Sequence, residues 1–283
     1  MKNDEERISW HPAFFEAIQM ELDEYSHALQ FISEYQLTTE PLRIDVVIIK
    51  KARDIAIKKN FASIFRKENI VEYKSPNDYV AVKDFYLVYG YACLYLVLNE
   101  TDINELTLSF VESRYPRELL THLQEIRGYT VEERWSGIYY IKGDILPIQI
   151  IDNRRLSADE NIWLKDLDNK LEAPEIRRIT TEIFRQGKAA RIKAYLDVIT
   201  KANKEKLQEA LEMSDTALTL EEVFRKAGLL EKWRAEGEAR GEARGEEKKA
   251  MEIAKNLLKN GFSVEQTANL SGLDITKVIA LSK

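Results

Sequence analysis

Three charged residues in the first half of the chain have the types and spacing that phosphate chemistry needs: Asp45, Glu72 and Lys74. Alternate residues of a strand share a face, so Glu72 and Lys74 should project together while Tyr73 points the other way. Asp45 stands within a second apolar run, residues 43–49, where an unpaired carboxylate is costly unless a cation or hydrogen bonds compensate it. A divalent cation would supply that compensation.

Two carboxylates that converge on a hard cation, with an amine beside them, suit the hydrolysis of phosphodiesters. The metal can polarise a phosphate and generate hydroxide, and Lys74 could orient or activate that water. A buried ion pair between Lys74 and one of the acids is the structural alternative, because strongly coupled charges also occur at sites without chemistry. Spacing alone leaves both interpretations open.

The elements that must position these residues alternate between helix and strand. Apolar residues recur at helical spacing after His11-Pro12, and β-branched or apolar runs indicate strands at 43–49, 55–57, 70–74 and 106–111. Further helices are expected at 80–98 and 117–126, a turn at 75–78, and a hairpin over 137–151 that turns at 142–144. This pattern predicts an α/β domain with a mixed sheet over residues 1–155.

Helix formers dominate the remainder of the chain. Ser157 to Glu160 has the form of a capping box, and a helical region is expected over 156–235. From 236 to 283 we expect a charged helix with glycines every four residues, then a helical hairpin around Ser271-Gly272-Leu273. The hairpin resembles a helix-turn-helix in length, but it carries few basic residues, so self-association through this tail is favoured over DNA reading.

Composition limits the possible partners and compartments. The chain has 283 residues, 45% of them hydrophobic, and a net charge of -6, so a nucleic-acid partner would need a local basic patch. Cys93 is the only cysteine, which excludes internal disulfides and paired-cysteine zinc sites and fits a cytoplasmic protein. The first residues lack the apolar segment of a secretory signal, and the longest uncharged run, 85–98, is too short to span a bilayer. We interpret that run as a buried helix and expect no membrane partner.

A local basic patch does occur between the two candidate strands, over residues 50–67, where Asp54 is the only acid. Its lysines and arginines would give salt-dependent contacts to nucleic-acid phosphates, and Arg43, on the strand face of Asp45, could add another. The alternative is a solvated hairpin edge, where lysines discourage edge pairing. The residues concerned are Lys50, Lys51, Arg53, Lys58, Lys59, Arg66 and Lys67.

The wider context of the three charged residues resembles a known superfamily. Arg43-Ile-Asp45 followed by Asn69-Ile-Val-Glu-Tyr-Lys74-Ser-Pro is similar to the PD-(D/E)XK nucleases, specifically the Rpn-like recombination-promoting nuclease and transposase family. Residues 84–95 and the late Gly/Glu/Arg-rich tail resemble that group as well. The chain departs from the pattern in lacking a proline before Asp45 and in the 27-residue separation of the two acids.

The resemblance implies a restriction-endonuclease-like mixed sheet flanked by helices and a magnesium-dependent DNA endonuclease linked to recombination or mobile elements. Asp45, Glu72 and the backbone carbonyl of Tyr73 would then hold Mg²⁺, for which Mn²⁺ could substitute, and Lys74 would assist the attacking water. An acid on the first helix often completes such a site. Glu21 is our choice, because it lies on the apolar stripe that should face the sheet, whereas Glu16 falls on the polar side. A catalytically inactive scaffold that binds DNA or a protein through the same fold is the alternative.

Overall fold

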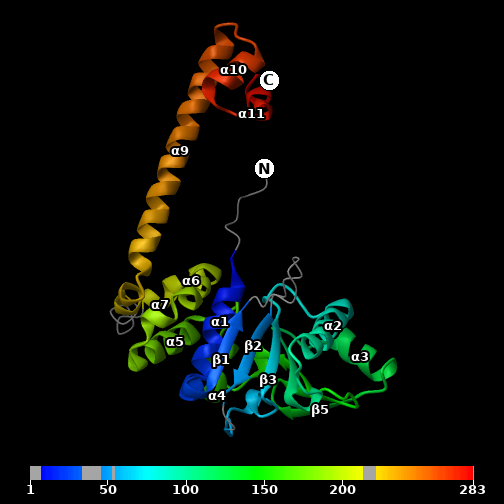
Figure 1. Cartoon of the computed structure of the whole chain (residues 1–283). Coiled ribbons are helices and arrows are strands. Elements are labelled where there is room, and N and C mark those ends of the chain that lie inside the picture. Colours follow the sequence, from blue (N-terminus) through cyan, green and yellow to red (C-terminus); the bar gives the residue numbers. More distant parts are fainter. Residues whose placement is uncertain (1–7, 34–45, 53–54, 213–220, 283) are drawn as a thin grey trace. The chain divides into compact units, whose positions relative to one another are not determined.

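A computed structural model describes residues 8–33, 46–52, 55–212 and 221–282 (Figure 1). Contacts between Cα atoms divide the chain into two compact units, Met1–Ala227 and Gly228–Lys283. The first unit contains the sheet and most of the helices, so residues 156–227 belong with the sheet rather than with the tail. Among the described residues, no helix combines the length and the apolar character needed to cross a bilayer.

One seven-stranded mixed sheet forms the centre of the first unit, in the order β1-β2-β3-β4-β7-β6-β5. β3, β4 and β7 run parallel to one another, and the other neighbouring pairs are antiparallel. The α/β class with a mixed sheet is therefore confirmed. The strands are β1 (Leu29–Ser33), β2 (Val46–Lys51), β3 (Glu68–Tyr73), β4 (Leu106–Glu112), β5 (Thr130–Trp135), β6 (Ile138–Lys142) and β7 (Ile148–Asp152).

Helices cover both faces of this sheet. α1 (Trp10–Glu21) lies on one face, where the ring of Phe14 stacks on Tyr73 with centroids 4.4 Å apart. α2 (Val82–Leu98) and α3 (Arg117–Glu125) lie on the other, where Phe85 contacts Phe110 in a cluster of buried residues. Side chains alternate along β3, so its odd and even positions serve different helices. This alternation decides which face each candidate site residue occupies.

The remaining helices of the first unit follow the sheet in sequence, and two of them, α4 and α6, contact α1. They include α4 (Ala158–Lys165), α5 (Ala173–Gln186), α6 (Lys193–Ala202) and α7 (Lys204–Glu212). Short 3-10 helices are η1 (Asp23–Ala28), η2 (Asn60–Ala62), η3 (Ile103–Glu105), η4 (Asn153–Arg155) and η5 (Ala189–Arg191). α4 begins after Ser157 as expected, but the Ser157 side chain makes no capping hydrogen bond.

The second unit is helical. α9 (Leu229–Lys259) includes the glycines at positions 237, 241 and 245, and nothing lies within 4 Å of where their side chains would begin. α10 (Val264–Ser271) and α11 (Ile275–Leu281) are separated by Gly272, whose φ of 71° ends the first of them. The expected long charged helix and helical hairpin are therefore present. Lys277 of α11 forms an ion pair with Glu247 of α9.

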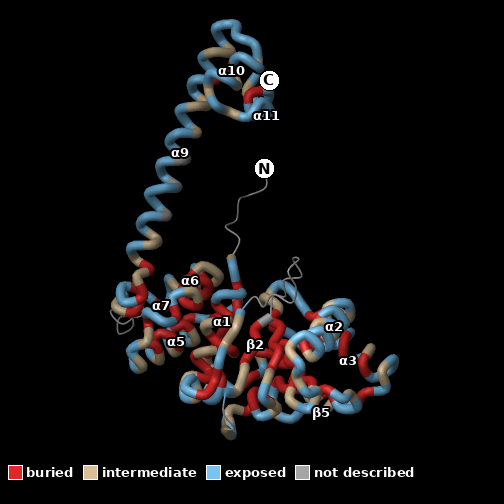
Figure 2. Tube along the Cα trace, viewed as in Figure 1, coloured by how far each residue is buried: buried red, intermediate tan, exposed pale blue. Residues whose placement is uncertain are grey.

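The structure corrects three sequence expectations. Residues 55–57 are not a strand. β1 and β5 are strands that the sequence patterns did not predict. The uncharged run 85–98 of α2 is buried on one side only, and exposed residues occur along its length (Figure 2). β2 and β3 pair antiparallel, as a hairpin requires, and the connection between them is long and includes η2.

Candidate active site

Glu72 and Lys74 lie together where β3 ends, as the two-residue spacing predicts. Glu72 is buried, and its Oε1 is 3.3 Å from Lys74 Nζ. The backbone N–H of Lys74 donates to Val111 of β4 at 2.9 Å, which extends the strand path to the turn at Ser75–Asp78. Tyr73 faces α1, so the Glu72–Lys74 pair occupies the α2 face of the sheet.

A third acid, Asp84 in the first turn of α2, completes this charge cluster. Its Oδ1 is 3.7 Å from Lys74 Nζ, and its Oδ2 accepts a hydrogen bond from the N–H of Ala81. Burial disfavours the Lys74 ammonium, but the carboxylates of Glu72 and Asp84 outweigh burial and raise the pKa of Lys74. Lys74 is therefore an ammonium at neutral pH, suited to orienting water or stabilising negative charge rather than to removing a proton.

Asp45 and Arg43 lie outside the described residues. Val46, which follows Asp45 in the chain, is the register partner of Glu72 in the antiparallel β2–β3 pair. The start of β2 and the end of β3 therefore meet at one end of the sheet.

Glu21 is located on the other side of the sheet from Glu72, because it belongs to α1. Its Oε1 accepts hydrogen bonds from the N–H groups of Trp163 and Leu164 in α4, at 2.6 and 3.1 Å. Its Oε2 lies 2.8 Å from Lys59 Nζ. Burial raises the pKa of Glu21, although the charge and hydrogen bond of Lys59 oppose that effect. These contacts favour a structural role that joins α1 to α4, and they do not bring Glu21 to Glu72.

The predicted phosphate-binding residues that the structure describes are mostly engaged with protein groups. Lys50 is 3.7 Å from Glu68, Lys59 binds Glu21, and Lys67 is 2.8 Å from Glu105. The Arg66 guanidinium donates to the backbone carbonyl of Asn104. Lys51 is half-buried and Lys58 is exposed. Acids from other elements therefore offset much of the positive charge that the sequence concentrates here.

Two further acids, which the sequence analysis did not identify, lie at the same end of the sheet. Glu112 ends β4 and is paired in register with Asp152, which ends β7. Glu112 is fully buried; its Oε2 accepts a hydrogen bond from the N–H of Val80, and its Oε1 has no hydrogen-bond partner. Burial raises the pKa of Glu112 to about 8, and burial likewise raises the pKa of Asp152. A carboxylate directly after a buried strand was the available sequence signal.

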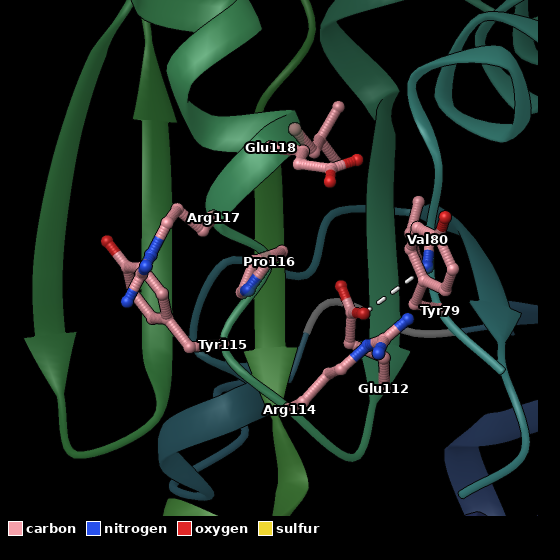
Figure 3. A pocket seen from close by; sticks show the side chains of 9 residues that line it. Tyr79, Val80, Glu112, Arg114, Tyr115, Pro116, Arg117 and Glu118 are labelled. Carbon is pink, nitrogen blue, oxygen red and sulfur yellow. Dashed lines mark hydrogen bonds between the residues drawn. The ribbon is translucent and has the colours of Figure 1, made fainter. Parts of the chain in front are cut away.

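Glu112 forms the floor of an open pocket of about 380 Å³ (Figure 3). The Arg114 guanidinium lies 3.9 Å from the ring centroid of Tyr79 at one side of this pocket. The start of α3 forms another side, and Figure 3 shows Glu118 above Glu112. The pocket therefore adjoins the strand end that follows β3 in the sheet.

Substituting Glu112 with glutamine is expected to remove a pH-dependent loss of stability. Because burial raises its pKa to about 8, the carboxyl group holds its proton up to about pH 8 in the folded state, whereas an exposed glutamate releases it near the ordinary pKa of 4.5. The folded chain thus binds more protons between these values, and its free energy of unfolding falls as pH rises, by on the order of 3 kcal/mol between pH 5 and 8. Glu112→Gln should melt like wild type at pH 5 and several degrees higher at pH 8.

Thermal unfolding across this pH range provides the measurement. Glu118→Gln is the control, because Glu118 is an exposed acid of the same pocket and should leave the pH dependence unchanged. A wild-type stability that does not fall between pH 5 and 8 would contradict the assigned proton on Glu112.

The fold and site together define an α/β protein with a mixed sheet and a carboxylate-rich strand end that also carries a lysine. Comparisons with models of protein families, with curated proteins and with solved structures find no match. Within the described residues, no group of three or more histidine, cysteine, aspartate or glutamate side chains has the arrangement of a metal site.

Proposed function

We propose that this chain is a magnesium-dependent DNA endonuclease of the PD-(D/E)XK kind, with Asp45, Glu72 and Lys74 as its central residues. The observation that carries the proposal is the position of Glu72 and Lys74 on one face at the end of β3, at the end of the sheet where β2 begins. A link to recombination or mobile elements rests on the sequence resemblance alone.

The available donor atoms are oxygens, which a hard cation such as Mg²⁺ prefers. Glu72 supplies carboxylate oxygens, Tyr73 a backbone carbonyl at the same strand end, and Asp45 would supply a second carboxylate. Bound Mg²⁺ would polarise the scissile phosphate and lower the pKa of a water molecule. Lys74, held as an ammonium, would orient the attacking water and offset the negative charge that develops on the phosphate.

Cleavage of supercoiled DNA tests the activity directly. Wild type should nick or linearise the plasmid with Mg²⁺ or Mn²⁺ and not with EDTA, and Glu72→Gln should lose the activity. Equal product with wild type and Glu72→Gln under either metal would indicate a contaminating nuclease.

Metal binding can be measured separately from cleavage. A ligand that binds only the folded state at 100 times its Kd stabilises that state by about 2.7 kcal/mol, so Mg²⁺ should raise the Tm by several degrees. Asp45→Asn should abolish this rise. Glu105→Gln is the matched control, because Glu105 directly precedes β4 at the opposite end of the strands and should retain the rise. No metal response from wild type would count against the nuclease.

A catalytically silent scaffold that binds DNA or a protein partner is the second candidate. One observation favours it: Lys74 is already held by two carboxylates, an arrangement that also suits a purely structural ion pair. The same metal titration separates the candidates, because the scaffold requires no cation at Glu72.

A further inference from the structure

The outer face of α2 exposes more apolar surface than the fold of one chain explains. Large side chains on this helix are uncovered: Tyr86 is 38% exposed, Leu87 53%, Leu94 43%, Val97 76% and Leu98 53%. No charged residue interrupts the helix between Phe85 and Leu98. Scattered exposed leucines are ordinary, but a contiguous apolar stripe of this kind marks an interaction surface.

The stripe has the spacing of a helix-pairing seam. Exposed positions 83, 87, 90, 94 and 97 follow one another at intervals of four and three residues, which is the pattern that keeps one face against a partner helix. Gly90 is at its centre, and among the described residues no atom outside its own stretch of helix lies within 4 Å of where its side chain would begin. Glycine there lowers helix propensity without serving the internal contacts of this unit, whereas it would allow another backbone to approach closely.

The ends of the stripe carry opposite charges. Lys83 is exposed in the first turn of α2, and Glu100 is exposed just beyond its last turn. If two copies of α2 cross antiparallel near Gly90, Leu87 meets Leu94 of the second copy, and each Lys83 lies within reach of the other Glu100. Helical side chains lean toward the helix N-terminus, so Lys83 leans toward that partner. We propose that α2 is a homodimer interface in which it pairs antiparallel with α2 of a second copy of this chain.

The length of the stripe sets the strength of the dimer. From Tyr86 to Leu98 a helix advances by about 18 Å, at about 1.5 Å per residue. A contact of this length between single helices buries less surface area than the roughly 800 Å² per partner of a standard stable interface. The dimer therefore dissociates on dilution. This interface is independent of the proposed nuclease activity and of the tail.

Sedimentation equilibrium of the full chain over a range of concentrations tests the proposal. Wild type should show a monomer–dimer equilibrium, and Leu94→Glu should shift its dissociation constant upward by 100-fold or more because it buries a charge in the seam. Phe184→Glu is the matched control: Phe184 is 45% exposed on α5, a helix that packs against α7, and its variant should dimerise like wild type.

Further variants address the geometry. Gly90→Leu should raise the Tm of the monomer yet abolish the dimer. Lys83→Glu should weaken the dimer, and adding Glu100→Lys should restore it. Cys93, the only thiol and exposed beside the seam, should react with a thiol reagent more slowly as the concentration rises.

A wild-type chain that stays monomeric, with Cys93 equally reactive at every concentration, would overturn the proposal and leave the face to a different partner. A dimer that survives both Leu94→Glu and Gly90→Leu would overturn it as well, and would assign self-association to another surface.

Discussion

Lys74→Ala is expected to reduce Mg²⁺-dependent cleavage of plasmid DNA by about 100-fold or more, the range typical for removing one group that stabilises transition-state charge. Lys74 is held by Glu72 at 3.3 Å and Asp84 at 3.7 Å, so its ammonium has a defined position beside the candidate metal ligands. The effect should be on kcat rather than on DNA binding. Single-turnover cleavage with enzyme in excess over DNA provides the measurement.

The control for this result lies on the same strand path. Lys67 directly precedes β3, pairs with Glu105, and is a mostly exposed side chain at the opposite end from Lys74. Lys67→Ala should cleave at close to the wild-type rate. Lys74→Ala should also keep the Tm increase with Mg²⁺, since it removes a competing cation and no metal ligand. Wild-type cleavage by a folded Lys74→Ala variant would remove Lys74 from the mechanism.

Glu21→Ala is expected to destabilise the first unit by about 3–5 kcal/mol, the usual cost of removing one partner from a buried charge pair. The substitution leaves the N–H groups of Trp163 and Leu164 without their acceptor and deprives Lys59 of its carboxylate. Urea or thermal unfolding, followed by circular dichroism, measures the loss.

A matched variant distinguishes structural support from metal binding at this position. Glu21→Gln keeps an oxygen for the α4 N–H groups but loses the charge opposite Lys59, so it should be destabilised less than Glu21→Ala. If Glu21 is structural, the glutamine variant retains the Tm increase with Mg²⁺. A metal response that disappears in Glu21→Gln, while its stability matches wild type, would instead restore Glu21 to the metal site.

Local patterns were sufficient to predict the elements that carry the site. The period of two in Ile70 to Lys74 placed Glu72 and Lys74 on one face, and the Ser-Pro-Asn-Asp sequence after them ended the strand. The long apolar run correctly indicated α2. It did not indicate that half of this helix is exposed, because a helix that is apolar all round has the same sequence whether its second partner lies in the same chain or in another.

Non-local pairing explains the remaining differences. Asp84, Glu112 and Asp152 join the site only because α2 begins beside Lys74 and because β4 and β7 run parallel to β3. Sequence spacing does not show which strands are neighbours in the sheet. It also does not show that Ile55 to Ile57 lie outside the strands. The positive charge of residues 50–67 was overestimated for a related reason. Glu21 and Glu105, which pair with lysines of this segment, come from distant elements.

Asp45 illustrates the limit of arguing from register. Its chain neighbour Val46 is opposite Glu72, and a displacement of one residue transfers a side chain to the other face of a sheet. Strict alternation from Val46 would turn the Asp45 side chain away from the face of Glu72, so the proposed site requires a bulge or a turn before Val46, which periodicity does not specify. The metal response of Asp45→Asn is therefore the most informative single measurement on the site.

The hydrogen bonds of α1 also constrain when the chain can fold during synthesis. Glu21 accepts a hydrogen bond from the N–H of Trp163, 142 residues later in the chain, and Glu16 accepts one from the N–H of Tyr195, 179 residues later. α1 therefore leaves the ribosome before α4 and α6, which supply the hydrogen-bond donors for its two carboxylates. Translation of nearly the whole first unit must precede its stable folding, and a nascent chain that stops at residue 155 should remain sensitive to protease.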